Sequence, residues 1–449
     1  RGFIYVKENN EDASENYLLS FFGRLNYTFM DRYLLTFTLR GDGSSRFAKS
    51  QRWGTFPSLA LAWRIDQEDF MNRFENLSTL KLRLGYGITG QQDIIGNDYP
   101  YLPNYTISND KAQYQFGNEF VYTLRPNGYD ANIKWEETTT WNVALDFGFY
   151  NNRINGSIDY YYRKTKDLLN EIPVAAGSNL TNKLVTNVGD LSNQGFEFNL
   201  NAIPITNDSW HWEVNVNMSY NKNKIIKLIR NKDPNYVGVL TGGISGGTGS
   251  TIQIHSEGHP SNAFYVYHQV YDENGKPLEG VYVDLNGDGI INQLDLYRYK
   301  SPAPKWLAGF SSYLKYKNWD LNIAGRFSFG NYVYNNVQSN GALYSRMYDN
   351  TGFYSNIPTA VSKTNFREAQ YFSDYYVQNA SFMKLDNITL GYNFQKLWKN
   401  RIDLRVFAIM QNVFTITRYK GLDPEIFNGI DNNVYPRPRT FLVGVNLGF

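Results

Sequence analysis

The most specific chemical pattern in the chain is an acidic, glycine-containing segment, Asp284-Leu-Asn-Gly-Asp-Gly-Ile-Ile-Asn-Gln-Leu-Asp295. It fits the calcium-loop pattern, in which oxygen ligands at alternate positions surround one hard cation and a central glycine permits a sharp turn. The pattern predicts a Ca²⁺ or Mg²⁺ site, whereas a metal-free turn held by Asx hydrogen bonds is the alternative. The candidate ligands are Asp284, Asn286, Asp288, the backbone carbonyl of Ile290, Asn292 and Asp295.

The sequence indicates no catalytic chemistry. It contains no cysteine, which excludes thiolate metal sites and thiol nucleophiles. The four histidines lack the His-Glu-x-x-His spacing, and no Gly-x-Ser-x-Gly elbow occurs. The glycine-rich segment 241–249 is not followed by the Lys-Ser/Thr pair of a phosphate-binding loop. We therefore assign no catalytic residue and no organic cofactor.

Tyrosines beside asparagines form the remaining candidate surface for a ligand. Tyrosine rings can stack on sugar rings or peptide side chains while asparagine amides donate and accept hydrogen bonds, which suits a neutral polar ligand. The alternative is that these rings pack loops together or contact a partner protein, and the sequence leaves both interpretations open. The candidates lie in predicted loops: Tyr99, Tyr101, Tyr105, Tyr114, Tyr265, Tyr267, Tyr332, Tyr334 and Tyr344.

Composition favours one large β-structure over several soluble domains. Aromatic residues make up 16% of the 449 residues, and these types prefer strands and membrane interfaces. The formal net charge is only +2, so nucleic acid is excluded as a partner. No apolar run is long enough for a transmembrane helix. The strands of a membrane barrel remain compatible, because they alternate lipid-facing and lumen-facing residues.

This alternation is the main signal for the fold. In the last segment Phe441, Val443, Val445, Leu447 and Phe449 are apolar. The alternate residues Thr440, Gly444, Asn446 and Gly448 are small or polar, with Leu442 the one exception. Such a period of two predicts a strand with one apolar face. The same rule places about thirteen strands, near residues 18–29, 33–40, 53–64, 80–86, 141–149, 154–162, 195–202, 212–220, 306–316, 319–329, 383–394, 403–413 and 440–449.

The predicted connections are sorted by length. Short ones at 30–32, 150–153, 204–209, 317–318 and 395–402 alternate with longer ones at 41–52, 87–140, 163–194, 221–305, 330–382 and 414–439, and only 65–79 is intermediate. Outer-membrane barrels have short periplasmic turns and long extracellular loops. The sorting therefore predicts an all-β, antiparallel transmembrane β-barrel in which 221–305 is a long extracellular loop carrying the calcium-type motif.

Tryptophan positions agree with this topology. They predict two belts of amphipathic rings at the membrane interfaces: Trp53, Trp141 and Trp306 at outer strand ends, and Trp63, Trp210, Trp212, Trp319 and Trp398 at inner ends. An odd number of strands is unusual for a bacterial barrel. Because the chain also opens at Arg1 without an initiator methionine or signal peptide, we expect it to be a processed product or fragment with further strands upstream.

Several motifs together resemble the SusC/RagA family of TonB-dependent outer-membrane transporters from Bacteroidota. They are Leu80-Lys-Leu-Arg-Leu-Gly-Tyr-Gly87, Trp135-Glu-Glu-Thr-Thr-Thr-Trp141, Asn187-Val-Gly-Asp-Leu-Ser-Asn-Gln-Gly-Phe-Glu-Phe198, the Asp-Leu-Asn-Gly-Asp-Gly stretch, and Gln411-Asn-Val-Phe414 followed by Lys420-Gly-Leu-Asp-Pro-Glu425. The resemblance runs from about residue 18 to Phe449. It makes residues 1–449 the C-terminal part of the receptor barrel.

The resemblance implies a barrel of about 22 strands with a plug inside, and neither the plug nor the first strands are in this sequence. It further implies energisation by TonB and a SusD-like surface lipoprotein that closes as a lid and helps to capture oligosaccharides or peptides. We expect nutrient import across the outer membrane, with the N-terminal barrel and plug segment, TonB, the lipoprotein and lipid or lipopolysaccharide as partners. A passive porin-type channel and a surface glycan-binding β-protein are the alternatives.

Overall fold

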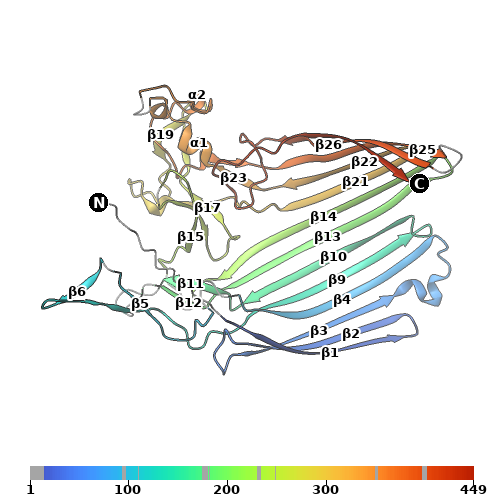
Figure 1. Ribbon diagram of the computed structural model, residues 1–449, viewed down its shortest axis with the longest axis horizontal. Coiled ribbons are helices and arrows are strands. Elements are labelled where there is room, and N and C mark those ends of the chain that lie inside the picture. The colour runs from blue at the N-terminus through green and yellow to red at the C-terminus, as the bar shows by residue number, and fades with distance from the viewer. Residues whose placement is uncertain are drawn as a thin grey trace, which may run out of the picture.

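One antiparallel sheet of thirteen long strands organises the molecule (Figure 1). The computed structural model describes residues 15–448 except 94–97, 110, 174–180, 182, 230–233, 248, 349–351 and 397–401. Each long strand pairs with the next one along the chain, which confirms the predicted antiparallel order. The strands are β1 (Leu18–Phe29), β2 (Tyr33–Ser44), β3 (Trp53–Arg64), β4 (Leu77–Gln91), β9 (Glu136–Phe149), β10 (Ile154–Lys166), β13 (Asp190–Thr206), β14 (Trp210–Lys227), β21 (Trp306–Tyr316), β22 (Trp319–Phe329), β25 (Phe382–Lys396), β26 (Ile402–Thr417) and β28 (Thr440–Gly448).

Several strands are longer than the alternation predicts. β13 begins at Asp190 and β14 ends at Lys227, so the loop expected at 221–305 begins at residue 228. The added residues are mostly polar on both faces, and the hydrophobic alternation that marks a strand in lipid therefore stops before the strand does. Backbone pairing continues beyond the membrane because it needs no apolar side chains.

The two ends of the sheet differ in the length of their connections. Figure 1 shows the long connections gathered at one end of the strands and tight turns at the other, as predicted. Tyr150, Asn151 and Asn152 adopt positive φ, which permits the sharp turn between β9 and β10. The longer connection after β3 folds into the 3₁₀ turns η1 (Ile65–Gln67) and η2 (Asp69–Met71).

Glu68 holds that longer connection against the ends of β2 and β3. Its carboxylate accepts hydrogen bonds from Trp63 Nε1 (2.9 Å), Tyr33 Oη (2.7 Å) and Arg32 Nη1 (2.8 Å). These hydrogen bonds, first that from Trp63, hold the pKa of Glu68 below its usual range. The connection is therefore compact despite its length.

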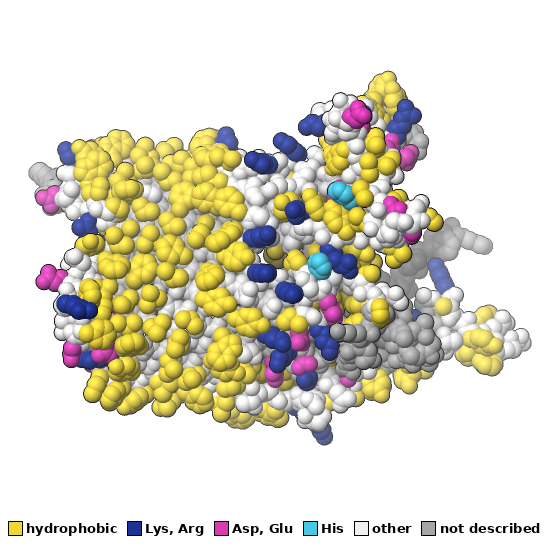
Figure 2. Space-filling view, turned by 180° about the vertical axis from the view of Figure 1, so that it is seen from behind, with side chains coloured by type: hydrophobic (Ala, Val, Ile, Leu, Met, Phe, Trp, Pro, Cys, Tyr) yellow, Lys and Arg dark blue, Asp and Glu magenta, His cyan; other side chains and the backbone are white. Residues whose placement is uncertain are grey.

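The outer face of the sheet is apolar. Figure 2 shows a continuous area of hydrophobic side chains over the strands, with charged side chains mainly toward the two ends. The register aligns Leu84, Val143, Tyr160 and Phe196 in one row across four strands. Among the residues that the structure describes, no helix is long and apolar enough to cross a membrane.

Two belts of aromatic rings border this apolar area, as predicted from the tryptophans. Ring pairs near the long-loop end are Phe21–Trp53, Tyr86–Trp141 and Tyr220–Trp306, and pairs at the tight-turn end are Tyr33–Trp63, Trp210–Tyr316 and Trp319–Tyr392. Trp398 lies outside the described residues. Trp135 belongs to neither belt, because it is buried against Phe47 and Phe56 beneath the loops.

The long connections contain small sheets and short helices of their own. They are β5 (Tyr105–Ile107), β6 (Gln113–Phe116), β7 (Glu119–Tyr122), β8 (Leu124–Pro126), β11 (Leu169–Pro173), β12 (Lys183–Asn187), β15 (Val239–Gly243), β16 (Thr251–His255), β17 (Ala263–Val266), β18 (Gln269–Tyr271), β19 (Pro277–Tyr282), η3 (Gln293–Asp295), β20 (Tyr297–Tyr299), β23 (Tyr332–Asn335), α1 (Asn336–Gly341), η4 (Tyr344–Met347), α2 (Val361–Thr364), η5 (Asp374–Tyr376), β24 (Val377–Asn379) and β27 (Ile430–Asp431). Residues from three connections, among them Phe264, Tyr334 and Ile430, share one hydrophobic core. The loops thus pack on each other as a folded layer.

Candidate ligand-binding site

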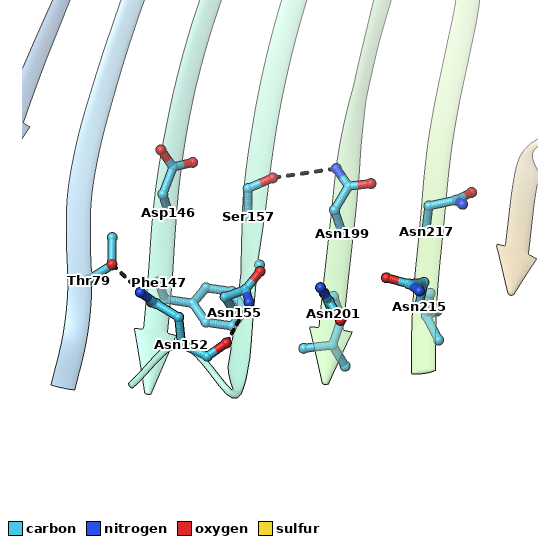
Figure 3. A pocket seen from close by; sticks show the side chains of 13 residues that line it. Thr79, Asp146, Phe147, Asn152, Asn155, Ser157, Asn199, Asn201, Asn215 and Asn217 are labelled. Carbon is cyan, nitrogen blue, oxygen red and sulfur yellow. Dashed lines mark hydrogen bonds between the residues drawn. The ribbon is translucent and has the colours of Figure 1, made fainter. Parts of the chain in front are cut away.

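The inner face of the sheet carries a band of asparagine amides (Figure 3). The register aligns Asn155 of β10 with Asn201 of β13 and Asn215 of β14, and the next luminal row contains Asn199 and Asn217. These side chains line a cavity of about 580 Å³. Because they alternate with outward-facing apolar residues, the same period of two produces the lipid-facing surface and this amide band.

On β14 the band extends along half of the strand. Asn215, Asn217, Asn221 and Asn223 occupy alternate positions, and Ser219 fills the gap between them. The tyrosine-based prediction overlooked this signal, although the sequence shows it directly. With a rise of about 3.3 Å per residue, the amides follow the inner face for roughly 27 Å.

A larger cavity of about 1060 Å³ opens at the long-loop end of the sheet, where the inner face meets the loops. Asn217 lines both cavities, so the amide band leads from one to the other. Phe427, from the connection 418–439, lines the large cavity with a fully exposed ring. Its amide lining includes Asn193, Asn217, Asn221, Asn223, Asn331 and Asn428.

An ion-pair network fixes the connection 418–439 to the inner face. Lys384 of β25 is 5% exposed, and its Nζ lies 2.8 Å from Asp423 Oδ1 and 2.9 Å from Glu425 Oε2. Glu425 also pairs with Arg326 of β22 (2.9 Å) and with Arg437 (3.2 Å). The cavity's charged lining residues, Arg326, Glu425 and Arg437, therefore form ion pairs with one another, and its other hydrogen-bonding side chains are neutral.

The structure places the predicted tyrosines in different environments. Tyr334 is fully buried and Tyr265 nearly so, in the loop layer, where their rings pack and present no face to solvent. Tyr101 packs beside Trp135, Tyr99 lies 6.3 Å from Tyr101, Tyr267 stacks on Tyr282, and Tyr332 lies against the loop core. Tyr105, Tyr114 and Tyr344 keep exposed rings, but none of the nine tyrosines lines the large cavity.

Buried Asp374 of η5 organises the tyrosines on one side of the loop layer. Its carboxylate accepts a hydrogen bond from Tyr297 Oη at 2.6 Å and lies 2.8 Å from His268 Nδ1. Burial, followed by this hydrogen bond, raises the pKa of Tyr297 well above its usual range. Burial also raises the pKa of Tyr271 and of Tyr282 to about 12. These phenols stay protonated at neutral pH.

The calcium-type segment forms a compact exposed turn. Asp284 accepts backbone hydrogen bonds from Gly287 (2.7 Å) and Gly289 (2.8 Å), and Asp288 accepts one from Ile290 (2.8 Å). Asn292 caps η3 through Leu294 N, and buried Asp295 accepts from the N–H groups of Asn292 and Leu285. These bonds, first that from Asn292, lower the pKa of Asp295. Within the described ranges, no three His, Cys, Asp or Glu side chains converge as a metal-ligand group.

An antiparallel wall with an apolar exterior, a polar interior and long connections at one end is the architecture of an outer-membrane β-barrel. The chain belongs to the TonB-dependent receptor family: the family model "TonB dependent receptor-like, beta-barrel" matches residues 4–413. This confirms the family inferred from the sequence motifs and places the wall in the outer membrane.

Individual relatives agree with this assignment. The chain is 49% identical over 450 residues to the TonB-dependent receptor SusC of Bacteroides thetaiotaomicron, and the alignment covers 99% of this chain and 45% of SusC. It is 33% identical to the TonB-dependent receptor P3 of Formosa agariphila, over 97% of this chain and 46% of P3. A solved structure of the RagAB peptide transporter matches with a TM-score of 0.78 and 26% identity, over 97% of this chain and 48% of that chain. The chain thus spans about half the length of the relatives it matches.

Proposed function

We propose that this chain forms the wall and the extracellular receptor surface of a TonB-dependent importer, and that its cargo is a neutral, hydroxyl-rich oligosaccharide. The observation that carries the proposal is the amide band, which joins the large outer cavity to the inner face through Asn217. Amides donate and accept hydrogen bonds, and the exposed ring of Phe427 can stack on the apolar face of a sugar. A peptide is the second candidate, favoured by the similarity to the RagAB peptide transporter.

The pairing of charges favours the oligosaccharide. Arg326, Glu425 and Arg437 of the cavity wall already pair within the Lys384 network. A peptide with free termini or charged side chains would have to compete for these partners or remain unpaired, which is costly in a partly desolvated cavity. A neutral ligand incurs no such cost.

Energisation by TonB requires parts of the receptor beyond this wall. Among the described residues, β1 pairs in the sheet with β2 alone and β28 with β26 alone, so two strand edges stay open. An open edge is not tolerated in lipid because its backbone groups lack partners. We propose that N-terminal strands close the wall around a plug, as the coverage of under half of SusC supports. A passive porin-type channel would have the closed wall without the plug.

A SusD-like lipoprotein is the proposed partner at the long-loop end. The connection between β4 and β9 exposes Tyr105, Tyr114, Phe116 and Phe120 on its small strands. Exposed aromatic groups of this kind mark protein contact surfaces. Tyr344, on another long connection, adds to the proposed receptor surface.

Binding by the intact receptor, purified with its partners, tests the cargo. We expect neutral oligosaccharides to bind more tightly than charged peptides of similar length, and Phe427→Ala to weaken oligosaccharide binding about tenfold because a stacking surface is lost. Isothermal titration calorimetry measures both. Phe353→Ala is the matched control, because Phe353 is also strongly exposed but lies outside the cavity.

Two results would contradict the proposal in different ways. Tighter binding of peptides by the wild-type receptor would make peptides the cargo. If the two phenylalanine variants bind the oligosaccharide equally well, the oligosaccharide does not contact Phe427 in the large cavity. The proposal of import would not be affected by this result.

We also propose that residues 284–295 bind Ca²⁺, or Mg²⁺ more weakly, through oxygen atoms of Asp284, Asn286, Asp288, Ile290, Asn292 and Asp295. The supporting facts are the ligand spacing and the closed turn around Asp284. Removal of Ca²⁺ with a chelator should loosen this turn and speed its backbone hydrogen exchange, and Asp284→Asn with Asp288→Asn should abolish the difference. If the exchange rates are the same with and without Ca²⁺, residues 284–295 form a metal-free turn held by Asx hydrogen bonds, and the proposal is wrong.

A further inference from the structure

A third pocket, more basic than the amide-lined cavities, lies at the outer ends of β14, β21 and β22, where it adjoins the large cavity and shares Asn221, Asn223 and Pro260 with it. It has a volume of about 530 Å³, and the described residues that line it include no carboxylate. Its lining instead carries the cationic side chains of Lys222, Arg298, Lys300 and Lys305, together with His259.

These cations are not balanced by described acidic partners. Lys222, Arg298, Lys300 and Lys305 make no ion pair with any carboxylate in the described part of the chain. Arg298 donates to Ser256 Oγ and lies over the Tyr265 ring, and Lys300 Nζ lies over the Tyr299 and Tyr332 rings at 5.2 and 5.4 Å. Arg298 also donates to the backbone carbonyl of Val237 at 2.6 Å. Neutral oxygens and ring faces thus hold Arg298 and Lys300 in place but leave their positive charge.

His259 lies among these cations. Its pKa is lowered, first by burial and then by the charges of Arg298 and Lys224. Four cations without a carboxylate in the described lining make the pocket a site of positive potential that favours an anion.

The pocket lies at the membrane boundary. Tyr220 forms part of its lining and also packs on Trp306 in the aromatic belt at the long-loop end, with ring centroids 4.7 Å apart. Lys222 is the next outward-facing residue of β14, about 7 Å further along the strand. Figure 2 shows that Lys and Arg side chains gather where the apolar area meets the loops. Aromatic belts mark the headgroup level of a membrane, so the cations lie at that level.

We propose that this pocket binds the phosphate group of a phosphorylated glycolipid in the outer leaflet. Phosphate oxygens accept charge-assisted hydrogen bonds from lysine and arginine, and four cations that line one pocket without carboxylates suit a phosphate group. The belt beside the pocket favours a lipid-borne phosphate over a dissolved one. The glycolipid would anchor the outer rim of the wall where β14 enters the loop layer.

The test uses the intact receptor in phosphatidylcholine vesicles that contain either monophosphoryl lipid A or the same lipid after removal of its phosphate. Lipid retained by the purified receptor is measured by native mass spectrometry, and inorganic phosphate is titrated separately in detergent. The test variant combines Lys222→Gln, Lys300→Gln and Lys305→Gln. The control combines Lys111→Gln, Lys363→Gln and Lys420→Gln, which removes the same charge from exposed sites outside the pocket.

The wild-type and control receptors should retain the phosphorylated lipid, and the pocket variant should bind it about a hundredfold more weakly, at roughly fivefold for each lysine. Heat-modified mobility on gels confirms that each variant is folded. Equal retention of the two lipids, or equal retention by pocket and control variants, would overturn the proposal. If inorganic phosphate binds as tightly as the lipid, the ligand of the pocket is a dissolved anion, and the glycolipid proposal is wrong.

Discussion

Replacing Ile158 with arginine should destabilise the folded wall by about 2–4 kcal/mol, because the new charge would face the lipid near the middle of the membrane. Ile158 is 47% exposed on the outer face of β10, in a row with Leu145 and Phe198. It lies midway between the turn at Ile154 and Tyr162, which pairs with Trp141 of the outer belt.

The neighbouring substitution Ser157→Arg is the matched control. Ser157 lies one residue away on the inner face, where it lines the amide-bordered cavity. Its arginine can reach water, so we expect a change of less than about 1 kcal/mol. Unfolding of the intact receptor in lipid vesicles with denaturant measures both. A larger effect of Ser157→Arg would mean that the two faces have been assigned the wrong way round.

Replacing Lys384 with alanine should release the connection 418–439 from the inner face. The lysine is nearly buried and contacts two carboxylates, so its removal leaves Asp423 and Glu425 without their central cation. Breaking a buried ion pair from one side costs about 3–5 kcal/mol. We expect the lower end of this range, because Arg326 and Arg437 still contact Glu425.

Hydrogen exchange of the backbone amides in 418–439 measures this release directly, since it reports local opening. Lys81→Ala is the control: Lys81 pairs with Asp146 at 2.9 Å, but it is more exposed and Arg83 also holds Asp146. Its loss should cost at most about 1 kcal/mol. Adding Asp423→Asn to Lys384→Ala should recover part of the protection, because it removes a carboxylate charge that would keep only the longer contact with Arg437, at 3.3 Å. Equal exchange in the two lysine variants would show that the network does not fix the loop.

The Lys384 network also gives a physical role to a family motif. Asp423 and Glu425 come from the Lys420-Gly-Leu-Asp-Pro-Glu425 segment, which supported the resemblance without indicating what its carboxylates do. Their partner Lys384 lies about forty residues earlier in the sequence, on β25. The motif positions the loop that presents Phe427 to the large cavity.

The wall itself was predictable from the sequence. Successive side chains of a strand in a membrane barrel face lipid and the barrel interior alternately. The residue patterns of 441–447 and 215–223 therefore identify the lipid-facing and the inner positions directly. Connection lengths then supplied the topology, and tryptophans supplied the level of the interfaces. The ends of strands such as β14 were missed because pairing continues after the lipid pattern stops.

The loop layer was decided by tertiary structure. Tyr265 and Tyr334 were predicted to be ligand contacts because they lie in long loops, yet both are buried in the loop layer. Tyr334 belongs to a core that segments far apart in the sequence form together. The Lys384 network and the basic pocket likewise join residues from different connections and strands. Period-two alternation records the environment of each residue within one strand, whereas contacts between distant loops leave no regular spacing in the sequence, so only the folded chain reveals them.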